Sequence, residues 1–115
     1  MTDGDNLSWK EFERVDLRVG TVVSAEFFAE AIKPAIKLSI DFGNGIGIKK
    51  SSAQITDHYE PETLVGKQIV AVVNFPKKQI GPFMSECLVT GFVQSSGDVI
   101  LAVPDKQVRD GSRMA

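Results

Sequence analysis

Residues 36–54 read IKLSIDFGNGIGIKKSSAQ, and this stretch gives the plainest indication of a fold. Its first seven residues alternate apolar and polar side chains, and a period of two is typical of a half-buried β-strand. Residues 43–45, Gly-Asn-Gly, favour a tight turn because glycine and asparagine tolerate a positive φ angle. The alternation resumes over residues 46–50, where the next strand is expected to end on two lysines. The stretch therefore predicts a β-hairpin.

Residues 15–27, which precede the hairpin, show a longer alternation and predict another half-buried strand. The face expected to be buried carries Val15, Leu17, Val19, Thr21, Val23, Ala25 and Phe27. Gly20 in the middle of this strand predicts a bulge or a sharp coil, as a small barrel needs.

A short helix is predicted over residues 61–65, because Pro61 suits a first helical turn and Gly66 suits the position just past the end. Residues 69–73, Ile-Val-Ala-Val-Val, are apolar on both faces. A strand of this kind is either central in a sheet or covered on both sides.

The C-terminal third of the chain is expected to add two strands. A basic loop over residues 77–82 precedes them, and they cover residues 87–89 and 99–101 around a turn at 95–98. The polar residues from Pro104 onward are expected to wrap back over the body of the protein as an extension.

The order strand, strand, strand, helix, strand, strand predicts a mainly β fold, a five-stranded OB-fold Greek-key barrel with short helices and N- and C-terminal extensions. A β-sandwich is the main alternative, but 115 residues with one inserted helix fit a small barrel better. We expect a flexible N-terminus over residues 1–7 and a single domain over residues 8–115.

The N-terminal end of this domain carries a helix signal. Ser8 and Glu11 are spaced as in a capping box and predict a helix over residues 9–13. A helix this short is not stable alone, so Trp9 and Phe12 are expected to pack on another surface.

The composition removes most catalytic and metal chemistries. Cys87 is the only cysteine and His58 the only histidine, so an intramolecular disulfide and a cysteine-based zinc site are excluded. The glycines of residues 43–47 lack the context of a nucleotide-binding loop, and no nucleophile elbow is present. We expect a non-catalytic binding protein without a cofactor.

The N-terminal residues 1–6 are polar and acidic, unlike a secretory signal, so a cytoplasmic location is expected. No apolar run approaches the ~20 residues of a membrane span, so no membrane insertion is expected.

The net charge of −2 conceals an uneven distribution, because lysines cluster in the middle of the chain. Residues 49–52, Lys-Lys-Ser-Ser, and residues 74–78, Asn-Phe-Pro-Lys-Lys, place ammonium groups beside hydroxyl and amide groups at predicted strand ends. Such groups suit salt-sensitive contacts with phosphates. Phe75 and Phe83 are the candidates for base stacking, and either could instead lie in the core.

Five segments resemble the tRNA-binding-domain family, and four of them resemble its CsaA branch in particular. The segment typical of the whole family is FERVDLRVGTV at residues 12–22. The others are KPAIKL at 33–38, IKKSSAQIT at 48–56, VVNFP at 72–76 and SECLV at 85–89. The resemblance extends over residues 9–113.

The resemblance implies a cytosolic homodimer with an OB-fold core that acts as an export-related chaperone for unfolded or precursor polypeptides. The wider family binds tRNA through basic strand ends and loops. On this analogy the RNA-binding residues are Lys49, Lys50, Ser51, Ser52, Asn74, Lys77, Lys78 and Ser85. The alternative is a stand-alone tRNA-binding module without a chaperone role.

Dimerisation also has a physical argument, because the chain offers more apolar surface than one small barrel readily hides. The residues expected at a dimer or peptide interface are Trp9, Phe12, Phe28, Val70, Val72, Phe75 and Phe83. The alternative is that these side chains fill the core of a monomer.

Overall fold

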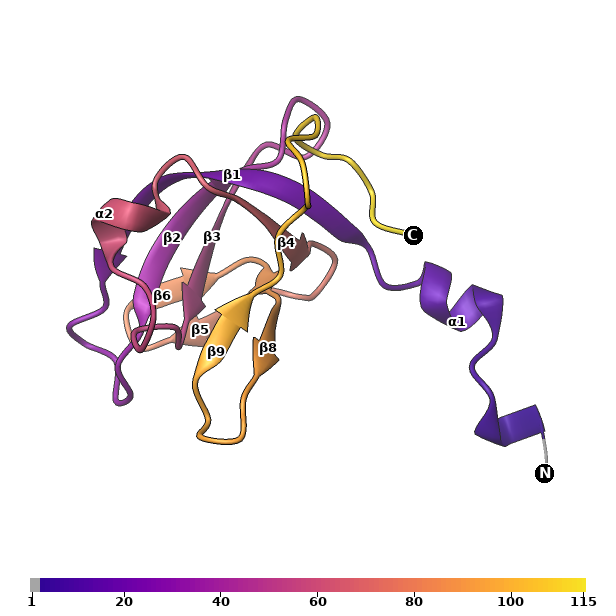
Figure 1. Cartoon of the computed structure of the whole chain (residues 1–115), viewed down its shortest axis with the longest axis horizontal. Coiled ribbons are helices and arrows are strands. Elements are labelled where there is room, and N and C mark those ends of the chain that lie inside the picture. Colours follow the sequence, from indigo (N-terminus) through magenta and orange to yellow (C-terminus); the bar gives the residue numbers. More distant parts are fainter. Residues whose placement is uncertain (1–2) are drawn as a thin grey trace.

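The computed structural model of the chain describes residues 3–115; residues 1 and 2, part of the segment predicted to be flexible, lie outside it. The helical elements are the 3-10 turn η1 (Asp3–Asp5), α1 (Trp9–Glu13) and α2 (Pro61–Leu64). The longer strands are β1 (Leu17–Phe27), β2 (Ile36–Asp41), β3 (Ile48–Ala53) and β4 (Gln68–Val72). The shorter strands are β5 (Lys78–Ile80), β6 (Phe83–Ser85), β7 (Leu88–Val89), β8 (Gly91–Val93) and β9 (Val99–Leu101) (Figure 1).

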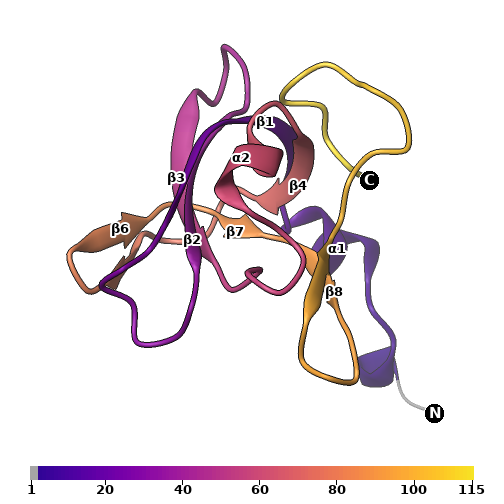
Figure 2. The ribbon, with the colours of Figure 1, turned by 60° about the vertical axis from the view of Figure 1, so that its left-hand side comes forward.

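A five-stranded antiparallel sheet in the order β3-β2-β1-β4-β7 forms the body of the protein. It curls until its two edge strands meet, where the Glu86 amide donates to the Lys50 carbonyl at 2.7 Å. In the chain, α2 connects β3 to β4. The helix packs beside β1, as Figure 2 shows, and buries Leu64 in the core. The nearly closed barrel confirms the predicted mainly β, OB-type fold.

The interior of the barrel is built on the alternation of β2. Ile36, Leu38 and Ile40 are at most 1% exposed, as is Phe42 just past the strand. Burial of each such side chain stabilises the fold by roughly 1.5–3 kcal/mol. The predicted burial of this face is confirmed.

Strand β1 contributes to two separate apolar clusters. Leu17 and Val19 pack with Val70 and Val72 of β4 on the outside of the barrel, whereas Val22 lies in the main core. Strand β4 is therefore covered on both faces, as its sequence predicts.

The expectation of one continuous buried face on β1 is wrong. The register shifts between Val22 and Ser24, so Val23 and Phe27 are 45% and 58% exposed. Gly20 is not the site of the bulge. A side chain there would come within 2.6 Å of Ile40 in the packed interior, so the missing Cβ makes room for the core.

The turn between β2 and β3 is longer than predicted. The Gly47 amide donates to the Gly43 carbonyl at 2.7 Å, and both glycines have φ angles above +80°. Ile46 therefore belongs to the turn, and β3 runs from Ile48 to Ala53. The two lysines stand near the beginning of this strand, not at its end.

The sequence analysis missed one short hairpin and misplaced the strands of another. The predicted basic loop 77–82 contains β5 and the turn of hairpin β5–β6, and this hairpin positions the Phe83 ring 5.5 Å from that of Phe28. The turn at residues 95–98 joins β8 to β9, whereas residues 88–89 close the barrel as β7.

The capping box of α1 is confirmed, because the Glu11 amide donates to the Ser8 hydroxyl and the Ser8 amide to the Glu11 carboxylate. The helix extends away from the barrel in Figure 1. Phe12 is half-buried against the outer cluster, but Trp9 is 87% exposed. Among residues 3–115, the expectation that Trp9 packs on another surface is not met.

The C-terminal residues return along the beginning of β1 as predicted. The Gly111 amide donates to Val19 and the Met114 amide to Leu17, at 2.7 and 2.9 Å. Within residues 3–115, no helix has the length and apolar character needed to cross a membrane.

Candidate functional site

An apolar pocket of about 420 Å³ opens where the chain leaves β4 and where it enters β7. We call it the Phe75 pocket, and its walls are Phe75, Pro76, Lys77, Lys78, Ser85, Cys87 and Leu88. Phe75 and Leu88 are 55% and 51% exposed, so the pocket presents apolar surface to solvent.

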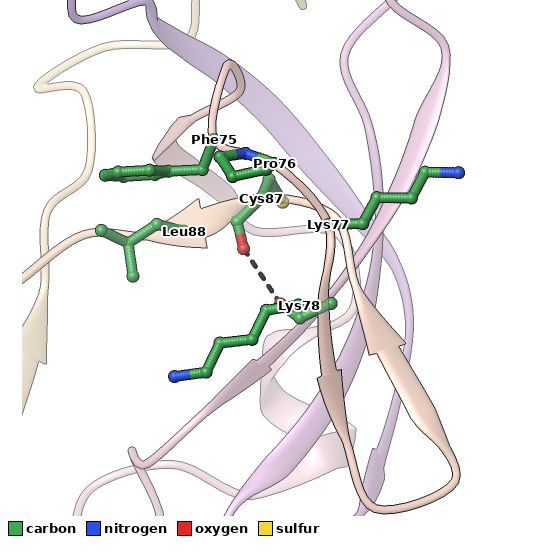
Figure 3. A pocket seen from close by; sticks show the side chains of 7 residues that line it. Phe75, Pro76, Lys77, Lys78, Cys87 and Leu88 are labelled. Carbon is green, nitrogen blue, oxygen red and sulfur yellow. Dashed lines mark hydrogen bonds between the residues drawn. The ribbon is translucent and has the colours of Figure 1, made fainter.

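The two lysines of the Phe75 pocket point in different directions. Figure 3 shows Lys78 extending on the side where Phe75 and Leu88 lie, whereas Lys77 points the other way. The Lys77 ammonium is 3.6 Å from a carboxylate oxygen of Glu86. Among the described ion pairs, none involves Lys78. Within residues 3–115, the pocket therefore combines an apolar wall with one lysine, Lys78, that forms no ion pair.

Glu86 fixes the segment that closes the barrel. Its carboxylate accepts a hydrogen bond from the Lys50 amide at 3.0 Å, and this bond, together with the positive charges of Lys77 and Lys50, lowers the pKa of Glu86. The neighbouring Cys87 is buried, and burial raises the pKa of its thiol to about 11. The thiol is therefore protonated and unreactive at neutral pH.

A second surface, which is polar, covers the outer face of β1, β2 and β3. We call it the lysine–aromatic face, and it consists of Ser24, Glu26, Lys37, Ser39, Lys50 and Phe83 around a hollow of about 290 Å³. The Lys37 and Lys50 ammonium groups lie 5.8 and 5.5 Å from the centre of the Phe83 ring. This spacing allows cation–π attraction, so the aromatic ring lies beneath positive charges.

Two of the predicted RNA-binding residues support the fold. Ser51 is 1% exposed, and its hydroxyl donates to the Cys87 carbonyl at 2.9 Å. The Asn74 amide group accepts from the Asp16 amide and donates to the Arg14 carbonyl, at 3.1 and 2.6 Å. Burial of the Ser51 hydroxyl corrects its assignment to a ligand surface, whereas Asn74 is exposed and its RNA-binding role stays a prediction.

The other predicted RNA-binding residues divide between two surfaces. Consecutive residues of a strand point to opposite faces, so Lys50 joins the lysine–aromatic face while Lys49 lies on the side of Ser51. Ser52 lies directly across from Lys37 on the outer face. Lys77, Lys78 and Ser85 line the Phe75 pocket. Lys49 is half-buried and lines neither the Phe75 pocket nor the lysine–aromatic face.

The residues predicted at a dimer or peptide interface also differ in burial, and only some of them are exposed. Phe28, Val70 and Val72 are 4%, 4% and 7% exposed, so they fill the core of the chain itself, which corrects their assignment. Phe12 is half-buried on the outer cluster and Phe83 half-buried on Phe28. Trp9 and Phe75 are the members of this set that remain largely exposed.

Ser24, Lys37, Ser39 and Leu88 were missed by the sequence analysis as site residues. The outward positions of the β1 and β2 alternations contain the first three, so pairing those strands in register would have placed them on one face. No comparable signal marks Leu88.

The chain matches the family described as "Putative tRNA binding domain" over residues 17–113. A crystal structure of chaperone CsaA from Bacillus anthracis is 51% identical, with a TM-score of 0.90 over 96% of this chain and 99% of that chain. A CsaA chaperone protein from Picrophilus torridus is 47% identical, with a TM-score of 0.88 over 96% and 100% of the two chains.

A longer relative matches at lower identity. A methionine–tRNA ligase of Bacteroides fragilis is 28% identical over 109 residues, which is 95% of this chain but 16% of the ligase. The present chain thus spans about a sixth of the length of such ligases. From the match over residues 17–113 and the likeness to two CsaA structures, the chain belongs to the tRNA-binding-domain family as a CsaA-type member.

Proposed function

We propose that the chain is a non-catalytic, homodimeric binding protein of the cytoplasm that holds unfolded or precursor polypeptides for export. The Phe75 pocket is the observation that carries this proposal. The likeness to two proteins named CsaA chaperone supports it.

The pocket has the chemistry that an extended polypeptide needs. Half-exposed Phe75 and Leu88 gain roughly 25 cal/mol for each Å² of apolar surface that a ligand covers. The free ammonium group of Lys78 attracts a carboxylate beside the bound apolar side chain. Neither contact requires a particular sequence, so many unfolded chains qualify as ligands.

The exposed helix α1 supports a dimer. None of its five residues is buried, Trp9 is 87% exposed, and the preceding Leu7 is 70% exposed. A helix of this length gains its stability from packing, and a second copy of the chain would supply that surface under two-fold symmetry. Sedimentation should then give about twice the 12.5 kDa of one chain, with a shift toward one chain in Trp9→Ala. A wild-type species of one chain at micromolar concentration would contradict the dimer.

RNA binding is the second candidate function, and the family match favours it. Lys50 takes part in none of the described ion pairs, so it is free to contact phosphates from the lysine–aromatic face. The two ligands would occupy the two surfaces separately.

The polypeptide proposal is tested by mixing the protein with a chemically unfolded, aggregation-prone polypeptide and measuring light scattering. Replacing Phe75 and Leu88 together by serine should weaken protection against aggregation about tenfold or more, because both apolar walls of the pocket are lost.

The matched control replaces Phe92 and Val93 by serine. These side chains are 62% and 74% exposed on β8, outside the pocket. Equal protection by the pocket variant and the wild type would contradict the proposal, as would an equal loss in the β8 control.

A further inference from the structure

Three polar residues form a straight row across the outer face of the barrel. Ser24 of β1 lies opposite Ser39 of β2, and Ser39 lies opposite Lys50 of β3. Directly opposed residues point to the same face, with Cβ atoms about 5 Å apart. The row therefore places two hydroxyl groups and one ammonium group side by side.

These groups are free to bind a ligand. The serine hydroxyls that form hydrogen bonds within residues 3–115 are those of Ser8, Ser51, Ser85 and Ser112, which leaves Ser24 and Ser39 free. The described ion pairs do not include Lys50. The row therefore offers three donors; the Lys50 ammonium group forms no ion pair among the described residues, although its charge acts on Glu86, which also pairs with Lys77.

The next row of residues along the strands contains an ion pair and adds no net charge. Lys37 lies opposite Glu26, and its ammonium group is 3.1 Å from the Glu26 carboxylate. This pair is neutral as a whole, so the net positive charge of the face is centred on Lys50. A ligand with one anionic group at that point fits better than a uniformly acidic surface.

An aromatic ring stands directly beside the row. Phe83 is half-buried on Phe28, and the Lys50 ammonium is 5.5 Å from the centre of its ring. When an anion draws the Lys50 ammonium group toward the serines, the ring loses one of its two covering ammonium groups, while Lys37 stays 5.8 Å from the ring centre. A planar base can stack on the ring surface that Lys50 leaves. A phosphate with an attached nucleoside satisfies both parts of this arrangement.

We infer that Ser24, Ser39 and Lys50 hold one phosphate of an RNA strand, with an adjoining base on Phe83. The inference rests on the RNA capacity proposed above and gives it a specific site. Ser and Lys side chains are ordinary partners of phosphate oxygens, and these contacts carry no sequence information. The site therefore binds RNA with little preference among bases.

The test measures the affinity of the full-length protein for a short, labelled single-stranded RNA as salt is varied. Lys50→Gln should lower affinity about tenfold at low salt and reduce the slope of log affinity against log salt by about 0.7. Replacing Ser24 and Ser39 together by alanine should lower affinity several-fold without changing that slope, because no charge is removed. Phe83→Leu should lower affinity by about tenfold through lost stacking.

Matched controls lie elsewhere on the surface. Lys106→Gln removes an exposed lysine of the C-terminal segment, and replacing Ser95 and Ser96 by alanine removes two exposed serines of the β8–β9 turn. Wild-type affinity in these controls supports the site. A loss in Lys106→Gln equal to that in Lys50→Gln would overturn it.

Failure of the inference is distinguishable from failure of the proposed RNA capacity. If the wild type binds the RNA and the row variants bind it equally well with unchanged melting temperatures, this inference alone is overturned. If the wild type does not bind RNA at any salt concentration, both are overturned. Displacement of the RNA by polyglutamate at equal charge concentration would identify a carboxylate ligand and also overturn it.

Discussion

The Phe75 pocket and the lysine–aromatic face are built from the same residue types, a phenylalanine with lysines and serines, but present them differently. In the pocket, Phe75 is 55% exposed and lies beside Leu88, with one ammonium group at the margin. On the face, Phe83 is half-buried beneath two ammonium groups. The first surface offers apolar area and the second offers positive charge, so exposure of the ring decides which ligand each suits.

Glu86 lies between the two surfaces and links them. Its carboxylate accepts from the backbone of Lys50, which belongs to the face, and pairs with Lys77, which belongs to the pocket. One acidic side chain thereby neutralises a lysine of the pocket and anchors a strand of the face.

The largest expected effect acts on the interior of the barrel, which supports both surfaces. A side chain at Gly20 would approach Ile40 to 2.6 Å in the interior that supports β2 and β3. Gly20→Val should therefore lower the free energy of unfolding by about 1–3 kcal/mol, measured by denaturant titration. Gly45→Val is the control, because a Cβ there meets no atom within 4 Å. Equal stability of the two variants would show that the interior tolerates the change.

The next largest effect is the difference in salt dependence between RNA binding and polypeptide binding. If RNA binding uses about three phosphate contacts, raising salt fourfold should weaken it roughly twentyfold. Binding of an unfolded polypeptide in the apolar pocket should change by no more than about twofold to threefold and show a negative heat-capacity change. Parallel loss of both affinities in the same titration would indicate that charge dominates the pocket as well.

A smaller effect is expected from Lys78, the pocket lysine that forms no ion pair in the described part of the chain. Lys78→Gln should weaken binding of an extended peptide that carries an acid beside an apolar residue by up to about fivefold, because an exposed ion pair contributes little. A peptide with glutamine in place of the acid should bind the variant and the wild type alike. Calorimetry with the two peptides measures the difference, and equal losses for both would refute a charge contact.

The smallest effect concerns Glu86. Its pKa is lowered in the folded protein by the Lys50 amide and the nearby lysines, so its charge stabilises the fold above the ordinary pKa of 4.5. That contribution is lost as the pH falls through the lowered pKa. Glu86→Gln should cost less than about 1 kcal/mol at pH 7, and the difference from wild type should vanish in acid. A difference that persists at the most acidic pH at which both proteins stay folded would assign the effect to packing.

The regular part of the fold could be predicted from the sequence because its signals are local. Each of three local patterns predicts its own element: the alternation of residues 36–42, the capping box at Ser8 and the apolar run at 69–73. The bulge after Val22 left no such signal, since it depends on how β1 meets β2. Hairpin β5–β6 was missed because its strands have only three residues each.

The candidate site was predicted in its residue types but not in its arrangement. Ser51 and Lys50 are neighbours in the sequence, yet one is buried against Cys87 and the other lies on the outer face. The residue opposite Lys50 is Ser39, eleven positions away, and it is found only when the register of β2 and β3 is known. Strand pairing therefore determines which residues share a surface, and the register of that pairing could not be predicted from the sequence alone.

The separation of the two surfaces can be measured directly by simultaneous binding. A short peptide with an apolar–acidic pair and a short single-stranded RNA, each with its own fluorescent label, are added to the protein together. We expect both ligands on one protein chain, with the affinity for the peptide changed less than about twofold by saturating RNA, as independent sites require. Stoichiometric displacement of the peptide by the RNA would contradict two separate surfaces.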